Sequence, residues 1–399
     1  MQPVETIPSV AIACGGTGGH LFPGLAIGEE LTRRGCTVSL IISPKEVDQQ
    51  AVQSAVGMEV LTLPSVGLAN RRIAAFFRGF VLSCRTARRQ FKASRPHAVL
   101  AMGGFTGAPA VLAGLRVGAA TFIHESNSIP GRANRWLAPL VDAAFIAFPD
   151  AARRLRCKRI KITGTPVRSR FQSGKCSGHG APDLDAALPA LLIMGGSQGA
   201  EGINDLITRS LPGFSARCPS LQFLHLTGSR DCQRVADAYA RHNLKAVVRP
   251  FLTEMEQALG MATAAVSRAG ASSLAELAAM RVPALLIPFP AAADNHQFYN
   301  AWAFVESGAA RMLEQERASP DVLIKMVAGL IENAEQRDTI KKSLARWHQS
   351  DAAERIAAEI FDTLARKGMN VPAITRARGD HPAPPPGSRP VEMETATVT

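Results

Sequence analysis

The sequence contains no uninterrupted run of about 18 apolar residues, so no membrane-spanning helix is expected. No basic residue precedes the first apolar stretch, and that stretch breaks at Gly15, so we expect no secretory signal. Tyrosine and tryptophan are scarce, with 2 and 3 copies, and no nucleic-acid-binding module is recognisable. These absences argue against an integral membrane protein, a secreted protein and a nucleic-acid-binding protein.

The pattern of cysteines also excludes several kinds of site. There are seven cysteines, an odd number, and no two of them have C-x-x-C spacing. This scatter argues against a disulfide framework and a zinc site, and it predicts reduced thiols in a cytosolic protein. The cysteines are Cys14, Cys36, Cys84, Cys157, Cys176, Cys218 and Cys232.

Length and charge indicate more than one domain. A chain of 399 residues with 46% hydrophobic residues is long enough for two or three domains with separate cores. The net charge of +12 is unevenly distributed: residues 1–166 hold 20 basic and 9 acidic residues, whereas residues 167–399 hold 25 and 24. The first half is therefore expected to meet an anionic surface.

Short apolar runs that end at glycines alternate with helical patterns, which is typical of a doubly wound α/β sheet. The first set predicts strands at 10–14, 38–42, 98–102, 119–123 and 143–148, with a helix over 21–34. After a Gly-, Ser- and Pro-rich connector at 172–188, strands are predicted at 190–194, 221–226, 246–249, 264–267 and 284–288. We therefore expect an α/β fold of two Rossmann-like halves with parallel sheets, followed by a disordered tail over 368–399.

The first glycine-rich turn, GGTGGH at 15–20, follows a strand and opens a helix. Its backbone amides and the helix dipole favour an anion, although tight packing of strand on helix would also require glycines. The spacing does not fit the G-x-G-x-x-G dinucleotide fingerprint, since Leu21 stands where the third glycine would be. His20 lies where open α/β sheets bind ligands, and it is either a structural histidine or a general base.

Three further turns follow predicted strands. Two of them are MGGFTG at 102–107 and GGSQG at 195–199. The last, SRAGASSLAE at 267–276, combines a glycine with Ser272 and Ser273, which can cap the helix or donate to a phosphate. Glu276 falls one turn into that helix, where a carboxylate either caps the helix or accepts hydrogen bonds from a vicinal diol such as a ribose.

Seven motifs in order give the chain a resemblance to the MurG family of glycosyltransferases over about residues 8–365. The motifs are GGTGGHLFPGLAIGEEL, MGGFTGAP, IHESNSIPGRANRWLA, GTPVR, IMGGSQGAEGIND, SRAGASSLAELAA and PFPAAADNHQFYNA. The resemblance implies a GT-B fold, with two domains facing a cleft. The acceptor- and membrane-facing domain would span 8–166 and be rejoined by a helix near 345–367. The donor-binding domain would span 167–344.

The resemblance implies inverting transfer of N-acetylglucosamine from UDP-GlcNAc to the C4 hydroxyl of undecaprenyl-diphosphate-linked muramyl-pentapeptide, in peptidoglycan synthesis, without cofactor or metal. His20 is the candidate base, with Glu125 as a second candidate. The implied UDP-GlcNAc contacts are Thr17, Gly18, Gly19, Asn127, Arg168, Ser197, Leu252, Ala271, Ser272, Ser273, Leu274, Ala275, Glu276 and Gln297.

The chain departs from the family in its second turn, where GGFTGAP stands in place of the common GGYxSGP. The tyrosine and serine hydroxyls are therefore missing at Phe105 and Gly107. Asp183-Leu184-Asp185 forms a D-x-D, which holds a divalent ion in other glycosyltransferases. Because it lies in the connector and away from any strand end, we interpret it as solvated charge.

The stretch 71–92 holds seven basic residues and no acidic one. Its apolar residues recur at helical spacing, so it is either an amphipathic membrane-surface helix or a core helix with an arginine-rich face. The membrane-facing residues would be Arg71, Arg72, Ile73, Phe76, Phe77 and Phe80. The expected location is peripheral, on the cytoplasmic face of the bacterial inner membrane, against anionic phospholipid and without nucleic acid.

Three alternative functions stay open at this point. Another GT-B transferase would keep the nucleotide half and differ in its acceptor half. A UDP-GlcNAc 2-epimerase would consume the nucleotide sugar without an acceptor. A non-catalytic nucleotide-binding regulator is the most distant of the three.

Overall fold

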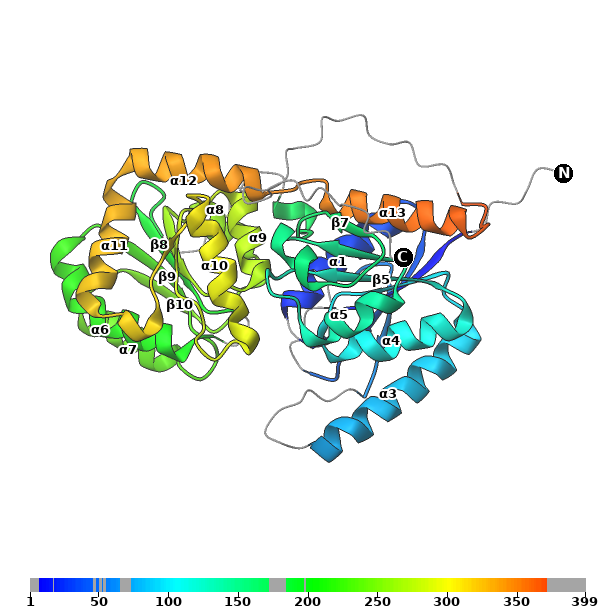
Figure 1. The fold of residues 1–399 in the computed structure, drawn as a ribbon. Coiled ribbons are helices and arrows are strands. Elements are labelled where there is room, and N and C mark those ends of the chain that lie inside the picture. Colours follow the sequence, from blue (N-terminus) through cyan, green and yellow to red (C-terminus); the bar gives the residue numbers. More distant parts are fainter. Residues whose placement is uncertain are drawn as a thin grey trace.

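Short apolar strands, buried on both faces, build two parallel sheets in this protein. A computed structural model describes residues 7–16, 18–45, 48–49, 52, 55–64, 73–171, 184–196 and 199–371, without the side chains of residues 73–75. Each sheet is the centre of an α/β domain, and the two domains lie side by side (Figure 1).

The first sheet has the order β3-β2-β1-β4-β5-β6-β7, and all its pairs are parallel. Its strands are β1 (Ser9–Ala13), β2 (Thr37–Ile42), β3 (Glu59–Thr62), β4 (Ala98–Ala101), β5 (Ala120–Glu125), β6 (Ala143–Ile146) and β7 (Ile160–Ile162). The strand order reverses between β1 and β4, which is where ligands bind in open α/β sheets.

Helices cover both faces of this sheet. The helices are α1 (Gly18–Arg33), α3 (Ile73–Ser94), α4 (Gly104–Val117), α5 (Arg132–Leu137) and α13 (Ala352–Arg366). One core cluster joins α1 and α13 to the sheet, and another joins α3 and α4 to it. The last helix of the described chain thus packs against the first helix, α1 (Figure 1).

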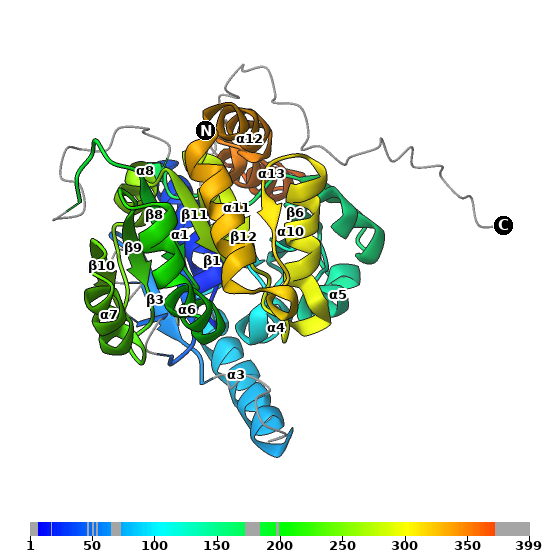
Figure 2. The same cartoon turned by 90° about the vertical axis from the view of Figure 1, so that its left-hand side faces the viewer.

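The second sheet has the order β10-β9-β8-β11-β12-β13, again all parallel. Its strands are β8 (Ala190–Met194), β9 (Gln222–Leu226), β10 (Ala246–Arg249), β11 (Ala264–Ser267), β12 (Ala284–Leu286) and β13 (Arg311–Met312). Figure 2 looks onto this domain and shows α11 beside α6 in front of the sheet.

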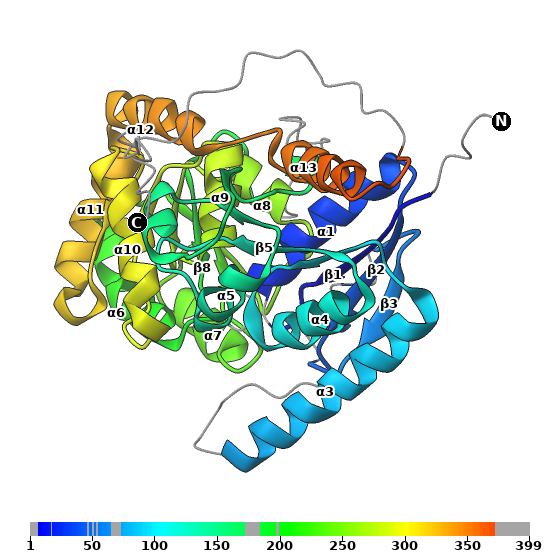
Figure 3. The same ribbon diagram turned by 45° about the vertical axis from the view of Figure 1, so that its right-hand side comes forward.

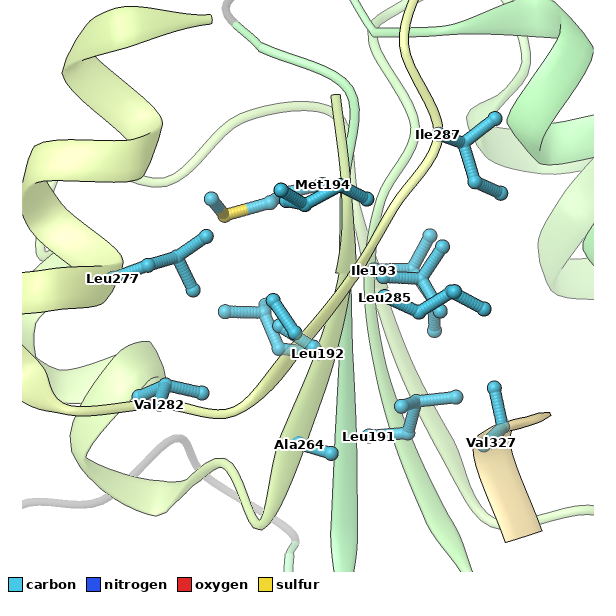
Figure 4. Close-up of a cluster of buried hydrophobic side chains, with 14 of the residues drawn as sticks. Leu191, Leu192, Ile193, Met194, Ala264, Leu277, Val282, Leu285, Ile287 and Val327 are labelled. Atoms are coloured by element: carbon cyan, nitrogen blue, oxygen red, sulfur yellow. The ribbon is translucent and has the colours of Figure 1, made fainter. Parts of the chain in front are cut away.

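The helices described around the second sheet are α6 (Glu201–Arg217), α7 (Cys232–Arg241), α8 (Met255–Met261), α9 (Ala271–Met280), α10 (His296–Glu306), α11 (Pro320–Glu332) and α12 (Ala334–Trp347). The central strand β8 is buried at every position. Figure 4 shows its Leu191, Leu192 and Ile193 among side chains from β12 and the helices, which explains why this strand reads as a continuous apolar run.

Aromatic packing joins the two domains. Phe148, just after β6, belongs to the core of the second domain. Its ring lies 5.2 Å from that of Trp347 and 6.3 Å from that of Phe304, and the latter two rings stack at 4.4 Å. The chain crosses between the domains at this cluster, so the core of the second domain includes part of the crossover.

The structure confirms the predicted fold class and corrects the boundaries of several elements. Strands β3, β7 and β13 were not predicted, because they are short edge strands with partly exposed residues. In the described chain α1 includes Gly18, so that His20 lies in its first turn and not before it. Strand β5 continues through Glu125, which places both His124 and Glu125 on a fully buried strand end.

Candidate active site

A cleft of about 1920 Å³ lies between the two domains. Its walls include the turns after β1, β4 and β5 in the first domain, and those after β8, β9, β10, β11 and β12 in the second. All of these turns follow the carboxyl ends of parallel strands, so the two binding edges share one space.

The first glycine-rich turn is held by a carboxylate that follows β2. Asp48 is fully buried, and its Oδ2 accepts a hydrogen bond of 2.7 Å from the Gly16 amide and one of 3.2 Å from the Ser43 amide. Lys45 donates from Nζ to the Gly16 carbonyl at 2.8 Å. The chain's own carboxylate therefore occupies part of the turn that we expected to bind an external anion.

The sequence analysis did not single out Asp48, because Ser43 and Pro44 stand at the end of the second strand and no acidic residue follows it directly. The carboxylate comes four residues after Pro44 and reaches back to the turn. The informative signal would have been an Asp or Glu a few residues beyond the second strand, together with the first glycine turn.

The second turn packs directly on His20. Gly103 and Gly104 both have positive φ, at 108° and 71°. A Cβ at Gly103 would lie 2.9 Å from His20 Nε2, and one at Gly104 would lie 3.3 Å from its Nδ1, so glycine is required here for space as well as conformation. Burial lowers the pKa of His20 to about 4, although Asp48 opposes this shift. The imidazole is thus neutral at neutral pH.

Phe105 and Thr106 of the second turn are linked to the first turn. Thr106 donates from Oγ1 to the Gly15 carbonyl at 3.0 Å. The Phe105 ring lies beside Gly16, and Lys45 Nζ lies 5.2 Å from its centroid. The two turns are therefore joined by a threonine hydroxyl and a cation–π contact.

Glu125 organises the loop that follows β5. Its Oε1 accepts from the backbone amide of Asn127 at 3.0 Å and from Nδ2 of the same residue at 3.1 Å. Its Oε2 accepts from the Gly131 amide at 2.8 Å and from Asn134 Nδ2 at 2.9 Å. With four donors on a carboxylate that is 3% exposed, the geometry favours a structural role over that of a base.

Two buried arginines line the cleft. Arg168 stacks over Phe22 and Phe171, at 4.5 and 5.4 Å from the ring centroids, and its Nε has no hydrogen-bond partner among the described residues. Arg268 donates to the carbonyls of Ile287 and Pro288, and burial lowers its pKa to about 10. Because arginine side chains carry a positive charge in proteins, the cleft is suited to a negatively charged ligand.

The first turn of α9 faces α1 across the cleft. Ser272 donates from Oγ to the Gly19 carbonyl at 3.0 Å, which brings the beginnings of the two helices together. Ser273 and Glu276 also line the cleft. Burial raises the pKa of Glu276 to about 8, against the attraction of Arg170.

The remaining predicted contacts differ in their accessibility. Gln297 accepts at Oε1 from the amides of Ala269 and Phe289, at 3.3 and 3.0 Å, which leaves its amide nitrogen as the end that can bind a ligand. Leu252 and Ala271 line the cleft. Leu274 is 1% exposed and packs in the core, so its side chain is not a ligand contact.

Several predicted residues lie outside the described part of the chain. These are Thr17, Ser197, Arg71, Arg72 and the side chain of Ile73. Ala275 is described but does not line the cleft. Gly18, Gly19, Asn127 and Gln297 do line it.

The D-x-D motif is remote from the cleft. Asp183 lies outside the described residues, while the backbone of Asp185 bonds to the Gln222 side chain at the beginning of β9, the edge of the sheet opposite the cleft. Within the described ranges, no group of three or more His, Cys, Asp or Glu side chains could hold a metal ion.

The fold and the cleft are those of a two-domain GT-B glycosyltransferase. Residues 10–146 match the glycosyltransferase family 28 N-terminal domain, and residues 190–356 match the glycosyltransferase family 28 C-terminal domain. The chain belongs to glycosyltransferase family 28, in the group represented by MurG.

A curated relative from Anaeromyxobacter dehalogenans is 34% identical, over 94% of this chain and 98% of its own length. It is named UDP-N-acetylglucosamine--N-acetylmuramyl-(pentapeptide) pyrophosphoryl-undecaprenol N-acetylglucosamine transferase. The crystal structure of Acinetobacter baumannii MurG matches with a TM-score of 0.69 and 26% identity, covering 89% of this chain and 99% of that one. A UDP-N-acetylglucosamine 2-epimerase structure has the same TM-score at 12% identity, covering 93% and 100%, which shows a shared fold alone.

His124, beside the cleft loop, generates a prediction about stability. Its Nε2 bonds to the Gly164 carbonyl at 3.0 Å and its Nδ1 to Ser126 Oγ at 3.2 Å, and burial lowers its pKa to about 4. Between pH 4 and about 6.5 the unfolded chain binds the extra proton, so stability falls as the pH drops through this window, by roughly 1.4 kcal/mol per pH unit for this histidine. Urea unfolding at pH 7 and pH 5 measures the slope.

The variant His124→Gln removes this titration and is expected to show a smaller loss of stability between pH 7 and pH 5 than the wild type. A slope equal to that of the wild type would contradict the assignment of a buried, neutral His124.

Proposed function

We propose that the chain transfers N-acetylglucosamine from UDP-GlcNAc to the C4 hydroxyl of undecaprenyl-diphosphate-linked N-acetylmuramyl-pentapeptide. The observation that carries this proposal is the interdomain cleft, in which His20 of α1 and the first turn of α9 face one space beside Arg168. Such a cleft fits a nucleotide sugar on the second domain and an acceptor on the first.

The reaction is a single displacement with inversion. The acceptor C4 oxygen forms a bond to the anomeric carbon while the bond from that carbon to the β-phosphate oxygen breaks. The hydroxyl proton passes to a base, and UDP leaves with the electron pair of the broken bond. The protein must therefore supply a base on one side of the sugar and positive potential on the other.

His20 is the proposed base. Its imidazole is neutral, which lets a ring nitrogen accept the proton, and the glycines of the second turn leave no room for it to swing towards them. Glu125 is the weaker candidate, because its carboxylate already accepts four hydrogen bonds.

The leaving diphosphate is proposed to lie at the first turn of α9. The exposed amides at a helix N-terminus favour an anion, and Arg168 adds a buried cation whose Nε has no partner among the described atoms. Arg268 lines the same cleft, and its hydrogen-bond partners are neutral carbonyl groups and the Gln315 amide. These amides and cations already lie in the cleft before the reaction, so few of them have to move when UDP departs.

An activity measurement tests the proposed reaction. Sugar transfer from labelled UDP-GlcNAc to a short-chain lipid-linked muramyl-pentapeptide is expected, and it should persist in EDTA. Consumption of UDP-GlcNAc without an acceptor would favour the epimerase alternative.

His20→Ala is expected to lower kcat by about 10²- to 10⁴-fold while donor affinity changes little, because a base acts in the transition state. Normal turnover in this variant would remove His20 as the base.

Glu276 is proposed to accept both ribose hydroxyls of UDP. The ionised carboxylate accepts one hydroxyl at each oxygen, whereas the protonated group carries a hydrogen on one of its oxygens, and a pKa of about 8 keeps most of it protonated at pH 6.5. UDP affinity is therefore expected to weaken about tenfold from pH 8.5 to pH 6.5, as calorimetry would show.

In Glu276→Gln, UDP should bind more weakly, and the part of the pH dependence that comes from Glu276 should disappear. Glu335→Gln, on helix α12, is the matched control, and its UDP affinity should depend on pH in the same way as that of the wild type. An identical pH profile in Glu276→Gln would refute the ribose contact.

Helix α3 is proposed to contact the membrane. Phe77 is 59% exposed, and its ring packs against Phe76, which in turn stacks on Phe80. All three line the cleft, and α3 projects from the domain in Figure 3. Exposed basic residues follow along the helix: Arg78, Arg85, Arg88, Arg89 and Lys92.

This arrangement suits a surface of anionic phospholipid, with apolar rings in the headgroup region and arginines at the phosphates. No helix in the described ranges is both long and apolar enough to span a bilayer. We therefore propose peripheral binding at the cytoplasmic face of the bacterial inner membrane, where a lipid-linked acceptor would reach the cleft past the three phenylalanines.

Replacing Phe76 and Phe77 with serine tests this contact. The variant is expected to partition to vesicles of anionic phospholipid at least about tenfold more weakly, because the transfer of two aromatic rings from water into the membrane no longer contributes to binding. UDP affinity should be unchanged. Val322→Ser on α11 is the control: it also removes an exposed apolar side chain, but away from α3, and it should bind vesicles normally. Undiminished vesicle binding by the phenylalanine variant would contradict the membrane assignment.

A further inference from the structure

A single buried asparagine spans the boundary between the two domains. Asn300 lies on α10 of the second domain and is 0% exposed. Its Oδ1 accepts from the Ser128 amide at 2.9 Å and from Ser128 Oγ at 3.0 Å. Its Nδ2 donates to Asn127 Oδ1 at 3.0 Å and to the Ala269 carbonyl at 3.1 Å.

These four contacts use the full hydrogen-bonding capacity of one amide group, two donors and two acceptors. Three of them reach the loop after β5 in the first domain, and the fourth holds the turn that leads into α9 in the second. A buried amide satisfied in this way is specific, because any shift of one domain against the other leaves buried polar groups without partners.

The contacts of Asn300 form part of a longer chain of hydrogen bonds. Asn127 bonds to Glu125, which holds the loop after β5. Ala269 donates its amide to Gln297 Oε1. Asn300 thus connects the acceptor-side loop to the residues proposed to bind the donor sugar.

Other polar contacts across the boundary are more exposed. Asp294 forms ion pairs with Arg135 and Arg132, whose side chains are 39% and 78% exposed. Exposed ion pairs contribute little and tolerate many geometries, whereas a buried amide network fixes one.

We infer that Asn300 is a positioning residue that sets the register of the donor half of the cleft against its acceptor half. It touches neither proposed reacting atom and acts through Asn127, Ser128 and Ala269. The expected effect of Asn300 on sugar transfer rests on the proposed function, whereas its expected effect on the structure does not.

The structural arm measures hydrogen exchange at the Ser128 amide, whose acceptor is Asn300 Oδ1. In Asn300→Ala this amide is expected to exchange at least about tenfold faster. Asn300→Asp keeps an oxygen for Ser128 while losing both donated bonds, so it should retain more protection at Ser128. Gln222→Ala is the matched control, because Gln222 is also buried and, among the described residues, its side chain bonds to Asp185 of its own domain. Unchanged exchange at Ser128 in a folded Asn300→Ala protein would overturn the inference.

The kinetic arm compares transfer with UDP binding. In Asn300→Ala, kcat/KM for the lipid acceptor should fall about 10- to 100-fold while UDP affinity changes less than about threefold. Equal losses in both would make Asn300 a donor-site residue and contradict the inference.

The double variant Ser128→Ala/Asn300→Ala should transfer no more slowly than Asn300→Ala alone, because the Ser128 contact is already lost. If the losses of transfer rate in the two single variants add up in the double variant, Ser128 and Asn300 do not act together and the inference is overturned. If the wild type transfers no sugar, the proposed function fails, and the exchange measurement still decides the role of Asn300.

Discussion

The parallel sheet is the constraint on which the rest of this structure depends. In a parallel sheet every strand ends at the same edge, so the loops that follow the strands gather there. The crossover at Phe148, Phe171 and Trp347 joins two such sheets so that these edges face one cleft. All proposed functional residues, with the exception of those on α3, come from loops or helix beginnings at the two edges.

Desolvation then sets the chemistry of the cleft. Burial lowers the pKa of His20 and raises that of Glu276. Arg168 Nε has no hydrogen-bond partner among the described residues, and the partners of Arg268 are neutral carbonyl and amide groups. In a water-filled groove none of these groups would be poised in this way, because solvent would screen the charges and restore ordinary pKa values. A neutral acceptor of protons and a region of positive potential are what a sugar transfer with a diphosphate leaving group requires.

Loops are held at this site by side chains that bond to backbone or to neighbouring amides. Asp48 holds the first glycine turn, Glu125 holds the loop after β5, and Asn300 ties that loop to the turn before α9. None of the three is free to act as a simple surface ligand. The arrangement gives rigid positions to residues on loops, which by themselves would be mobile.

The sequence alone determined the fold class and the two-domain organisation, because apolar runs that end at glycine turns are local patterns. It also determined the family, because the motifs that carry the resemblance can be read in order along the chain. It also located His20, Arg168 and Glu276 within such motifs. Only the tertiary structure decided which polar groups are already in use. The sequence offered Glu125 as a second candidate base, and only the structure shows the four donors that already bond to it. Asp48 and Asn300 were not singled out, because their partners at Gly16 and Ser128 lie 32 and 172 residues away. A hydrogen bond depends on positions in space, and burial, which sets the charge state of His20 and Glu276, depends on everything packed around them.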